Sequence, residues 1–140
     1  MESQTTKIIV KAMIDANVKK VWDYWTKPQH ITKWNFASDD WHCPTAENDL
    51  RVGSKMSTRM EAKDGSFGFD FEVIYEEVIE HKKIAYSMAD GRVAITHFED
   101  VGGMTKVTTI FDAEKENSVE LQQGGWQAIL NNFKKYTETN

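Results

Sequence analysis

The sequence predicts an α+β domain in which antiparallel strands are grouped apart from a long C-terminal helix. Its 140 residues are the length of one domain, spanning residues 1–140. In residues 6–14 and again from 54 to 111, apolar and polar residues alternate with the period of β-strands. Residues 117–136 instead carry apolar side chains at helical spacing. Strands that are segregated from a terminal helix are typical of the α+β class.

The N-terminal third predicts one strand followed by two short helices. The strand covers residues 6–14, and Asn17 then stands where a helix N-cap belongs. Trp22 and Trp25 belong to the apolar stripe of the helix that follows, so we expect both to pack in the core. Pro28 ends that helix or opens the second one at its first position.

The middle of the chain predicts an irregular segment and then a meander of strands. Residues 35–53 are polar and are expected to lack regular structure. The strands that follow are joined by the turn signals Asp64-Gly65, Asp90-Gly91 and Gly102-Gly103. The meander is expected to have roughly six antiparallel strands, and those marked by alternation cover residues 54–62, 67–76, 84–88, 93–98 and 105–111. The pattern leaves open whether His97 or its neighbours Thr96 and Phe98 face inward.

The last segment changes to a helical period. Asn117 with Glu120 three residues later is a helix-start pattern, because the glutamate can reach back to the main chain. The apolar residues that follow at helical spacing are Leu121, Trp126, Ile129, Leu130, Phe133 and Tyr136. The sequence therefore predicts a long helix with a wide apolar face.

Composition excludes several classes of protein. The net charge of −5 argues against a nucleic-acid partner, which requires a basic surface. No run of about 18 apolar residues occurs, so we expect no membrane insertion. The N-terminus lacks the basic and apolar regions of a secretory signal, which favours a cytoplasmic location. The single cysteine, Cys43, and the scattered histidines predict neither a disulfide nor a metal site, and no cofactor motif is present.

Several local strings resemble one known family over nearly the whole chain. They are RVGSKM (51–56), FDFEVIYEEVIEHKKIAYSM (69–88), THFED (96–100), GGMTKVTTIF (102–111) and the matching positions Ala16, Val21, Trp22, Thr26, Pro28, Ile31 and Trp34. The chain resembles the START-like, helix-grip (SRPBCC or birch-pollen-allergen-like) superfamily, and within it the family named for the activator of the heat-shock-protein-90 ATPase. Ser54 stands where that family has a second glycine, and His81 or a neighbour stands where it has a proline.

The resemblance implies a curved antiparallel sheet wrapped around the C-terminal helix, with a cavity for an apolar ligand between them. The residues are compatible with this, because aromatic and methionine side chains lie on the expected inner faces. The candidate ligand-binding residues are Trp34, Trp41, Met56, Met60, Phe69, Phe71, Tyr75, Tyr86, His97, Trp126, Ile129, Leu130 and Phe133. Asp70 and Glu72 lie on the opposite face of their strand and are expected in solvent.

Three functions follow as hypotheses. The first is a binding protein for a small hydrophobic ligand, aromatic or lipid-like. The second, which relatives in the superfamily suggest, is an enzyme similar to polyketide cyclases or aromatases, with His97, Tyr75 and Tyr86 as proton-transfer candidates. The third, which the family name implies, is a chaperone partner that stimulates a heat-shock-protein-90 ATPase. Edge strands and the segment around Trp41 are candidate surfaces for a homodimer.

Overall fold

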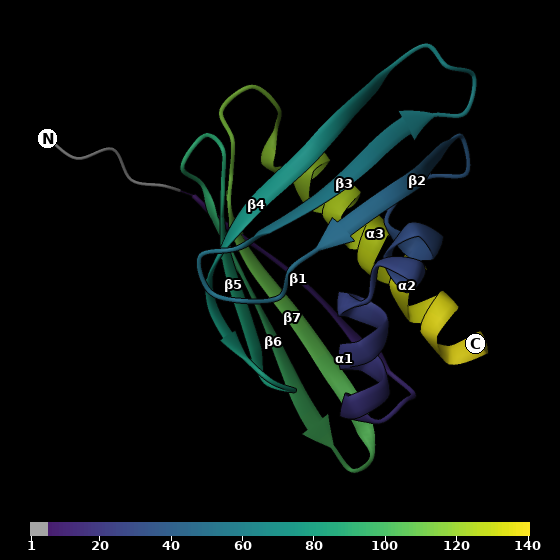
Figure 1. Ribbon diagram of the computed structural model, residues 1–140, viewed down its shortest axis with the longest axis vertical. Coiled ribbons are helices and arrows are strands. Elements are labelled where there is room, and N and C mark those ends of the chain that lie inside the picture. Colours follow the sequence, from purple (N-terminus) through teal and green to yellow (C-terminus); the bar gives the residue numbers. More distant parts are fainter. Residues whose placement is uncertain (1–5) are drawn as a thin grey trace, which may run out of the picture.

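The computed structural model describes residues 6–140, and in it a curled antiparallel sheet wraps around the long helix α3 (Figure 1). The seven strands pair in the order β1-β7-β6-β5-β4-β3-β2. In chain order the elements are β1 (Lys7–Ile14), α1 (Val18–Thr26), α2 (Pro28–Trp34), β2 (Trp41–Asn48), β3 (Lys55–Ala62), β4 (Gly68–Ile79), β5 (Lys83–Met88), β6 (Val93–Val101), β7 (Met104–Asp112) and α3 (Val119–Thr139). The predicted α+β class with a helix-grip arrangement is confirmed. Most of the segment on which the secretory-signal argument rests lies outside the described residues.

The prediction of an irregular segment at residues 35–53 is wrong, because part of it forms the strand β2. This strand pairs only with β3, at one edge of the sheet. Pro44 lies within it, and its register shifts between His42 and Thr45. Proline has no N–H to donate, so it is tolerated in strands at an edge or at an irregularity. The sheet consequently has seven strands, β1 and the six that follow α2.

The predicted helix starts are correct for α1 and α2 and one residue off for α3. The Asn17 side chain accepts a hydrogen bond from the Lys20 N–H at 2.9 Å, and Pro28 is the first residue of α2. The cap of α3 is Ser118, whose Oγ accepts from the Leu121 N–H at 3.1 Å. Asn117 instead donates its main-chain and side-chain N–H groups to the Glu114 carboxylate.

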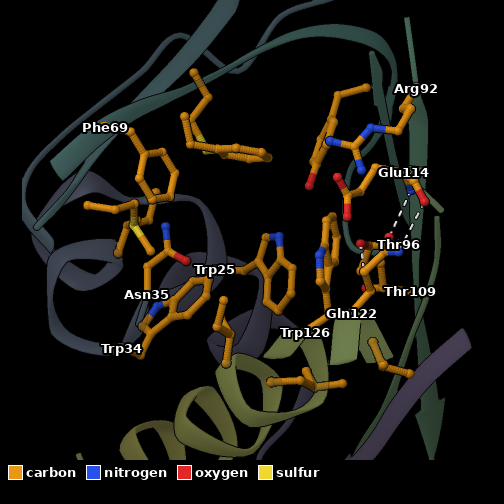
Figure 2. Close-up of a pocket in the computed structure, with 18 of the residues that line it drawn as sticks. Trp25, Trp34, Asn35, Phe69, Arg92, Thr96, Thr109, Glu114, Gln122 and Trp126 are labelled. Carbon is orange, nitrogen blue, oxygen red and sulfur yellow. Dashed lines mark hydrogen bonds between the residues drawn. The ribbon is translucent and has the colours of Figure 1, made fainter. Parts of the chain in front are cut away.

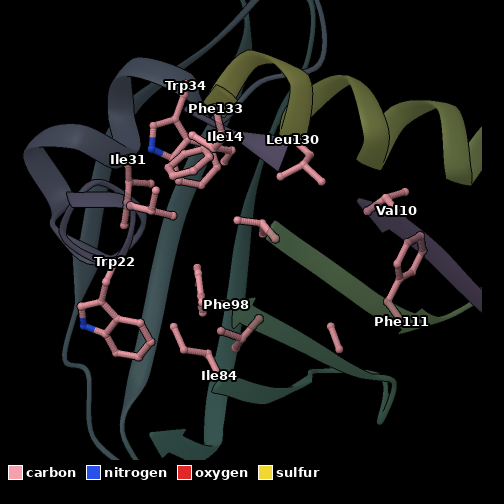
Figure 3. Close-up of a cluster of buried hydrophobic side chains, with 14 of the residues drawn as sticks. Val10, Ile14, Trp22, Ile31, Trp34, Ile84, Phe98, Phe111, Leu130 and Phe133 are labelled. Atoms are coloured by element: carbon pink, nitrogen blue, oxygen red, sulfur yellow. The ribbon is translucent and has the colours of Figure 1, made fainter. Parts of the chain in front are cut away.

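The core lies between the inner face of the sheet and the three helices. In β6 the buried side chains are Ala94, Thr96 and Phe98, whereas His97 is exposed on the outer face. The rings of Trp22 and Phe98 meet edge to face at 5.2 Å beneath α1. Figure 3 shows this part of the core, with Ile84, apart from the α3 residues Leu130 and Phe133.

Helix α3 lies along β1 and also closes its free edge. The Gln127 side chain both accepts from the Lys11 N–H and donates to the Lys11 carbonyl, at 3.2 and 3.0 Å. Lys134 donates to the Met13 carbonyl at 2.8 Å. Because these groups occupy the main-chain positions that another strand would use, pairing of a further strand with β1 is blocked. Neither α3 nor any other helix within residues 6–140 is long and apolar enough to cross a membrane.

Candidate ligand-binding cavity

A cavity of about 390 Å³ lies between the inner face of the sheet, α2 and α3 (Figure 2). Apolar and aromatic side chains form most of its wall, and the polar side chains other than Asn35 gather at one end. The lining residues are Val10, Trp25, Ile31, Trp34, Asn35, Met56, Met60, Phe69, Phe71, Tyr86, Arg92, Thr96, Thr109, Glu114, Asn117, Gln122, Trp126, Ile129 and Leu130. Strands β3 and β4 supply its methionines and phenylalanines, and the helices supply its three tryptophans.

Three aromatic rings fix one wall of the cavity. The indoles of Trp25 and Trp34 lie 5.0 Å apart between ring centroids. The ring of Phe133 meets both edge to face, at 4.9 Å from Trp25 and 4.8 Å from Trp34. Trp34 is also tied by its Nε1–H, which donates to the Tyr24 carbonyl at 2.9 Å. Edge-to-face packing and this hydrogen bond hold the wall in one arrangement.

Trp126 supplies a further aromatic part of the cavity wall. One side of its indole stacks on the Phe111 ring, with centroids 3.8 Å apart and planes 11° apart. Its half-buried ring also borders the cavity (Figure 2). The stacking fixes the orientation of Trp126 in the cavity wall.

The polar end is built from side chains that already bond to one another or to the main chain. The hydroxyls of Thr96 and Thr109 share a hydrogen bond of 2.8 Å. The buried Gln122 amide accepts from the Glu114 N–H and donates to the Asn117 carbonyl, both at 2.8 Å. These bonds hold the connection between β7 and α3 against the cavity, because Gln122 is in the first turn of α3.

Tyr86 and Arg92 complete the polar end from β5 and from the turn before β6. Burial raises the pKa of Tyr86, and the neighbouring Tyr75 adds to the rise, whereas the charge of Arg92 opposes it. The Tyr86 hydroxyl is therefore protonated at neutral pH and can act as a hydrogen-bond donor. Arg92 donates through Nε to the Asp90 carboxylate at 2.7 Å.

Nine of the thirteen candidate residues named from the sequence line this cavity. They are Trp34, Met56, Met60, Phe69, Phe71, Tyr86, Trp126, Ile129 and Leu130. As expected, Asp70 and Glu72 are exposed on the opposite face of β4.

The other four candidates lie elsewhere. Trp41 packs beside the β3–β4 hairpin, near the edge of the sheet. Tyr75 is buried, and its hydroxyl donates to the Asn48 side chain at 2.6 Å. Phe133 is fully buried behind the wall that it supports. Placing His97 in the cavity is wrong, since the β6 register turns the neighbouring positions inward and leaves it exposed.

The three proton-transfer candidates are not brought to one place. Of His97, Tyr75 and Tyr86, only Tyr86 borders the cavity. Within residues 6–140, no group of three His, Cys, Asp or Glu side chains is arranged to hold a metal ion.

Sequence reasoning also missed lining residues. Trp25 was assigned to the core, and it both packs there and borders the cavity. Arg92 is two residues before the inward-facing Ala94, so strand alternation could have placed it once the inner face was known. Gln122 is four residues before Trp126, which puts the two on the same face of α3.

Comparisons with known proteins agree with this architecture. The profile of the family described as "Activator of Hsp90 ATPase homolog 1-like protein" matches residues 15–138. The solved structure of an AHSA1-like protein from Aeromonas hydrophila shares 41% identity, covers 96% of this chain and 93% of its own, and has a TM-score of 0.90. A solved structure from Cytophaga hutchinsonii shares 48% identity with the same coverages and a TM-score of 0.83.

A more distant structure bears on the fold alone. It comes from Chromobacterium violaceum, shares 17% identity, covers 96% of this chain and 99% of its own, and has a TM-score of 0.86. None of the curated proteins matches this chain.

Proposed function

The chain belongs to the Activator of Hsp90 ATPase homolog 1-like family, within the SRPBCC superfamily, and we propose that it binds a small hydrophobic molecule, aromatic or lipid-like, between the sheet and α3. The observation that carries this proposal is the cavity of about 390 Å³ with aromatic walls. Ligand pockets usually measure about 300–1,000 Å³ and are mostly apolar with a few polar groups. The size and the lining both fit that description.

The energetics of packing support the same function. Protein interiors are close-packed and hold few voids larger than a water molecule. A void in an apolar core destabilises a fold, because the side chains around it lose contacts. In this chain Trp25, Trp34 and Trp126 border such a void instead of filling it. A ligand that fills the void restores the lost contacts and raises the free energy of unfolding.

A cavity-filling variant tests the proposal. Ile129 borders the cavity, so Ile129→Trp places a large ring where the ligand would lie. Leu121 on the same helix is 63% exposed and does not border the cavity, so Leu121→Trp is the matched control. Native mass spectrometry with a panel of lipids and polycyclic aromatic molecules is expected to show adducts with the wild type and the control. Adducts that persist in Ile129→Trp, or none with any protein, would contradict the proposal.

The family description suggests a second candidate, stimulation of an Hsp90 ATPase. An aromatic cluster at the β3–β4 hairpin, formed by the exposed Phe67 and Phe69 and the half-buried Trp41, offers a surface for a protein partner. Phe67 is 61% exposed, so Phe67→Ser removes an anchor with little effect on folding. A rise in chaperone ATPase rate with the wild type that Phe67→Ser reduces would support this function. An unchanged rate at excess protein would exclude it.

A further inference from the structure

The polar end of the cavity holds two opposite charges that do not neutralise each other. Figure 2 shows Arg92 and Glu114 at the same end, yet no ion pair joins them in the described part of the chain. Arg92 donates through Nε to Asp90 at 2.7 Å and through Nη1 to the Asp112 carbonyl at 3.5 Å. Glu114 uses Oε1 to accept both N–H groups of Asn117, at 2.8 and 2.7 Å. Across residues 6–140, Arg92 Nη2 and Glu114 Oε2 are left without a hydrogen-bond partner.

Two further donors are available beside them. The Tyr86 hydroxyl borders the cavity and forms no hydrogen bond with residues 6–140. The Thr96 and Thr109 hydroxyls carry two hydrogens, and their mutual bond uses one, so the other can be donated. A ligand that enters this end therefore meets several donors and one carboxylate acceptor.

We propose that the ligand is uncharged and carries an acceptor oxygen next to an N–H or O–H donor, the pattern of a carboxamide. This inference rests on the cavity binding proposed above. A carboxylate ligand would face Glu114, and an ammonium ligand would face Arg92. Each ion would also meet the opposite charge, but the attraction of one group and the repulsion of the other offset each other, so neither ion recovers the hydration that it loses on entering the cavity. A carboxamide instead offers its carbonyl to Arg92 and Tyr86 and its N–H to Glu114.

Isothermal titration calorimetry with four probes of one skeleton tests this. The probes are naphthalene, 2-naphthamide, 2-naphthoate and 2-naphthylmethylammonium, at pH 7. The wild type is expected to bind the amide about tenfold or more tightly than either ion, since an ion loses more hydration than an amide and the two opposite charges of the site give it no net attraction in return. Tyr86→Phe removes one donor and is expected to weaken amide binding severalfold, while naphthalene binding stays the same.

Charge variants provide a sharper readout, because each changes the preference in a specific direction. Glu114→Gln removes the repulsion of the carboxylate probe and is expected to tighten 2-naphthoate binding about tenfold. Arg92→Gln is expected to do the same for 2-naphthylmethylammonium. Glu116→Gln alters an exposed carboxylate outside the cavity wall and is the control that should change neither. Circular dichroism checks that every variant is folded.

The outcomes separate this inference from the proposed function. Equal affinity for all four probes, or tightest binding of an ion by the wild type, overturns the inference and leaves cavity binding in place. If no probe binds while lipid adducts persist in native mass spectrometry, the inference alone fails. If no probe binds and no lipid adduct is seen, both the inference and the proposed function fail.

Discussion

Phe133 supports the aromatic wall, and its removal yields a defined loss of stability. It is fully buried and meets the indoles of Trp25 and Trp34 edge to face at 4.9 and 4.8 Å. A buried phenylalanine changed to alanine costs about 3–5 kcal/mol, of which two aromatic pairs account for about 0.5–1.5 kcal/mol each. Phe133→Ala is therefore expected to lower the free energy of unfolding by about 4 kcal/mol. Domains of this size are stable by about 5–15 kcal/mol, so the variant should still fold.

Urea denaturation followed by far-ultraviolet circular dichroism measures this loss. At about 4 °C per kcal/mol, the melting temperature should also fall by about 16 °C. Near-ultraviolet circular dichroism should lose tryptophan signal, because Trp25 and Trp34 lose the ring that orients them. Leu121→Ala on the same helix is the control, since an exposed substitution costs about 0.5 kcal/mol or less. If Phe133→Ala lowers the free energy of unfolding by less than about 1.5 kcal/mol, Phe133 does not pack tightly against Trp25 and Trp34, and the reasoning is refuted.

Three more predictions concern single buried groups. Burial by itself raises the pKa of Asp112, but hydrogen bonds from Lys7 and the Val93 N–H and the nearby positive charges lower it in sum. Its stabilisation is thus complete above the ordinary aspartate pKa of about 3.9 and is lost as pH falls through the lower folded value. The wild type should exceed Asp112→Asn in urea stability at pH 7, with a smaller difference at pH 3; an equal difference at both would contradict this. Burial raises the pKa of the Cys43 thiol to about 11, so a disulfide reagent at pH 8 should modify native protein far more slowly than urea-unfolded protein. Equal rates would show an accessible thiolate. The Thr137 hydroxyl is buried without a hydrogen-bond partner among residues 6–140, so Thr137→Val should raise the free energy of unfolding by about 1 kcal/mol; a comparable loss would mean that the hydroxyl is bonded.

Local sequence signals were sufficient wherever one element decides its own structure. Asn17 caps α1 because its side chain reaches a main-chain N–H three residues ahead. Gly65 and Gly91 form the predicted turns with φ of 77° and 90°, values that glycine adopts without strain. Such signals involve only neighbouring residues, so they can be read before the fold is known.

Local sequence signals did not predict the structure where pairing with another strand determines whether a segment is a strand or which of its faces points inward. Residues 41–48 have little strand character of their own, and pairing with β3 makes them β2 despite Pro44. The orientation of β6 has the same origin. A shift of one residue reverses every side chain of a strand, so only its pairing with β5 and β7 could send Thr96 inward and His97 outward.

By itself the sequence determined the α+β class, most element boundaries and the apolar stripes that face the core. Trp25 and Phe133 show what only the tertiary structure decided. The sequence predicts Trp25 in the core and Phe133 at the ligand, whereas Trp25 borders the cavity and Phe133 does not. Both belong to apolar helix stripes, and a stripe about 100° wide fixes which way a side chain points, but not whether another ring or empty space lies there. The packing of α1 and α2 against α3 put Phe133 behind the wall and Trp25 on its surface. Trp25, Trp34 and Trp126 therefore form parts of one cavity wall only because contacts between residues far apart in the chain bring them together.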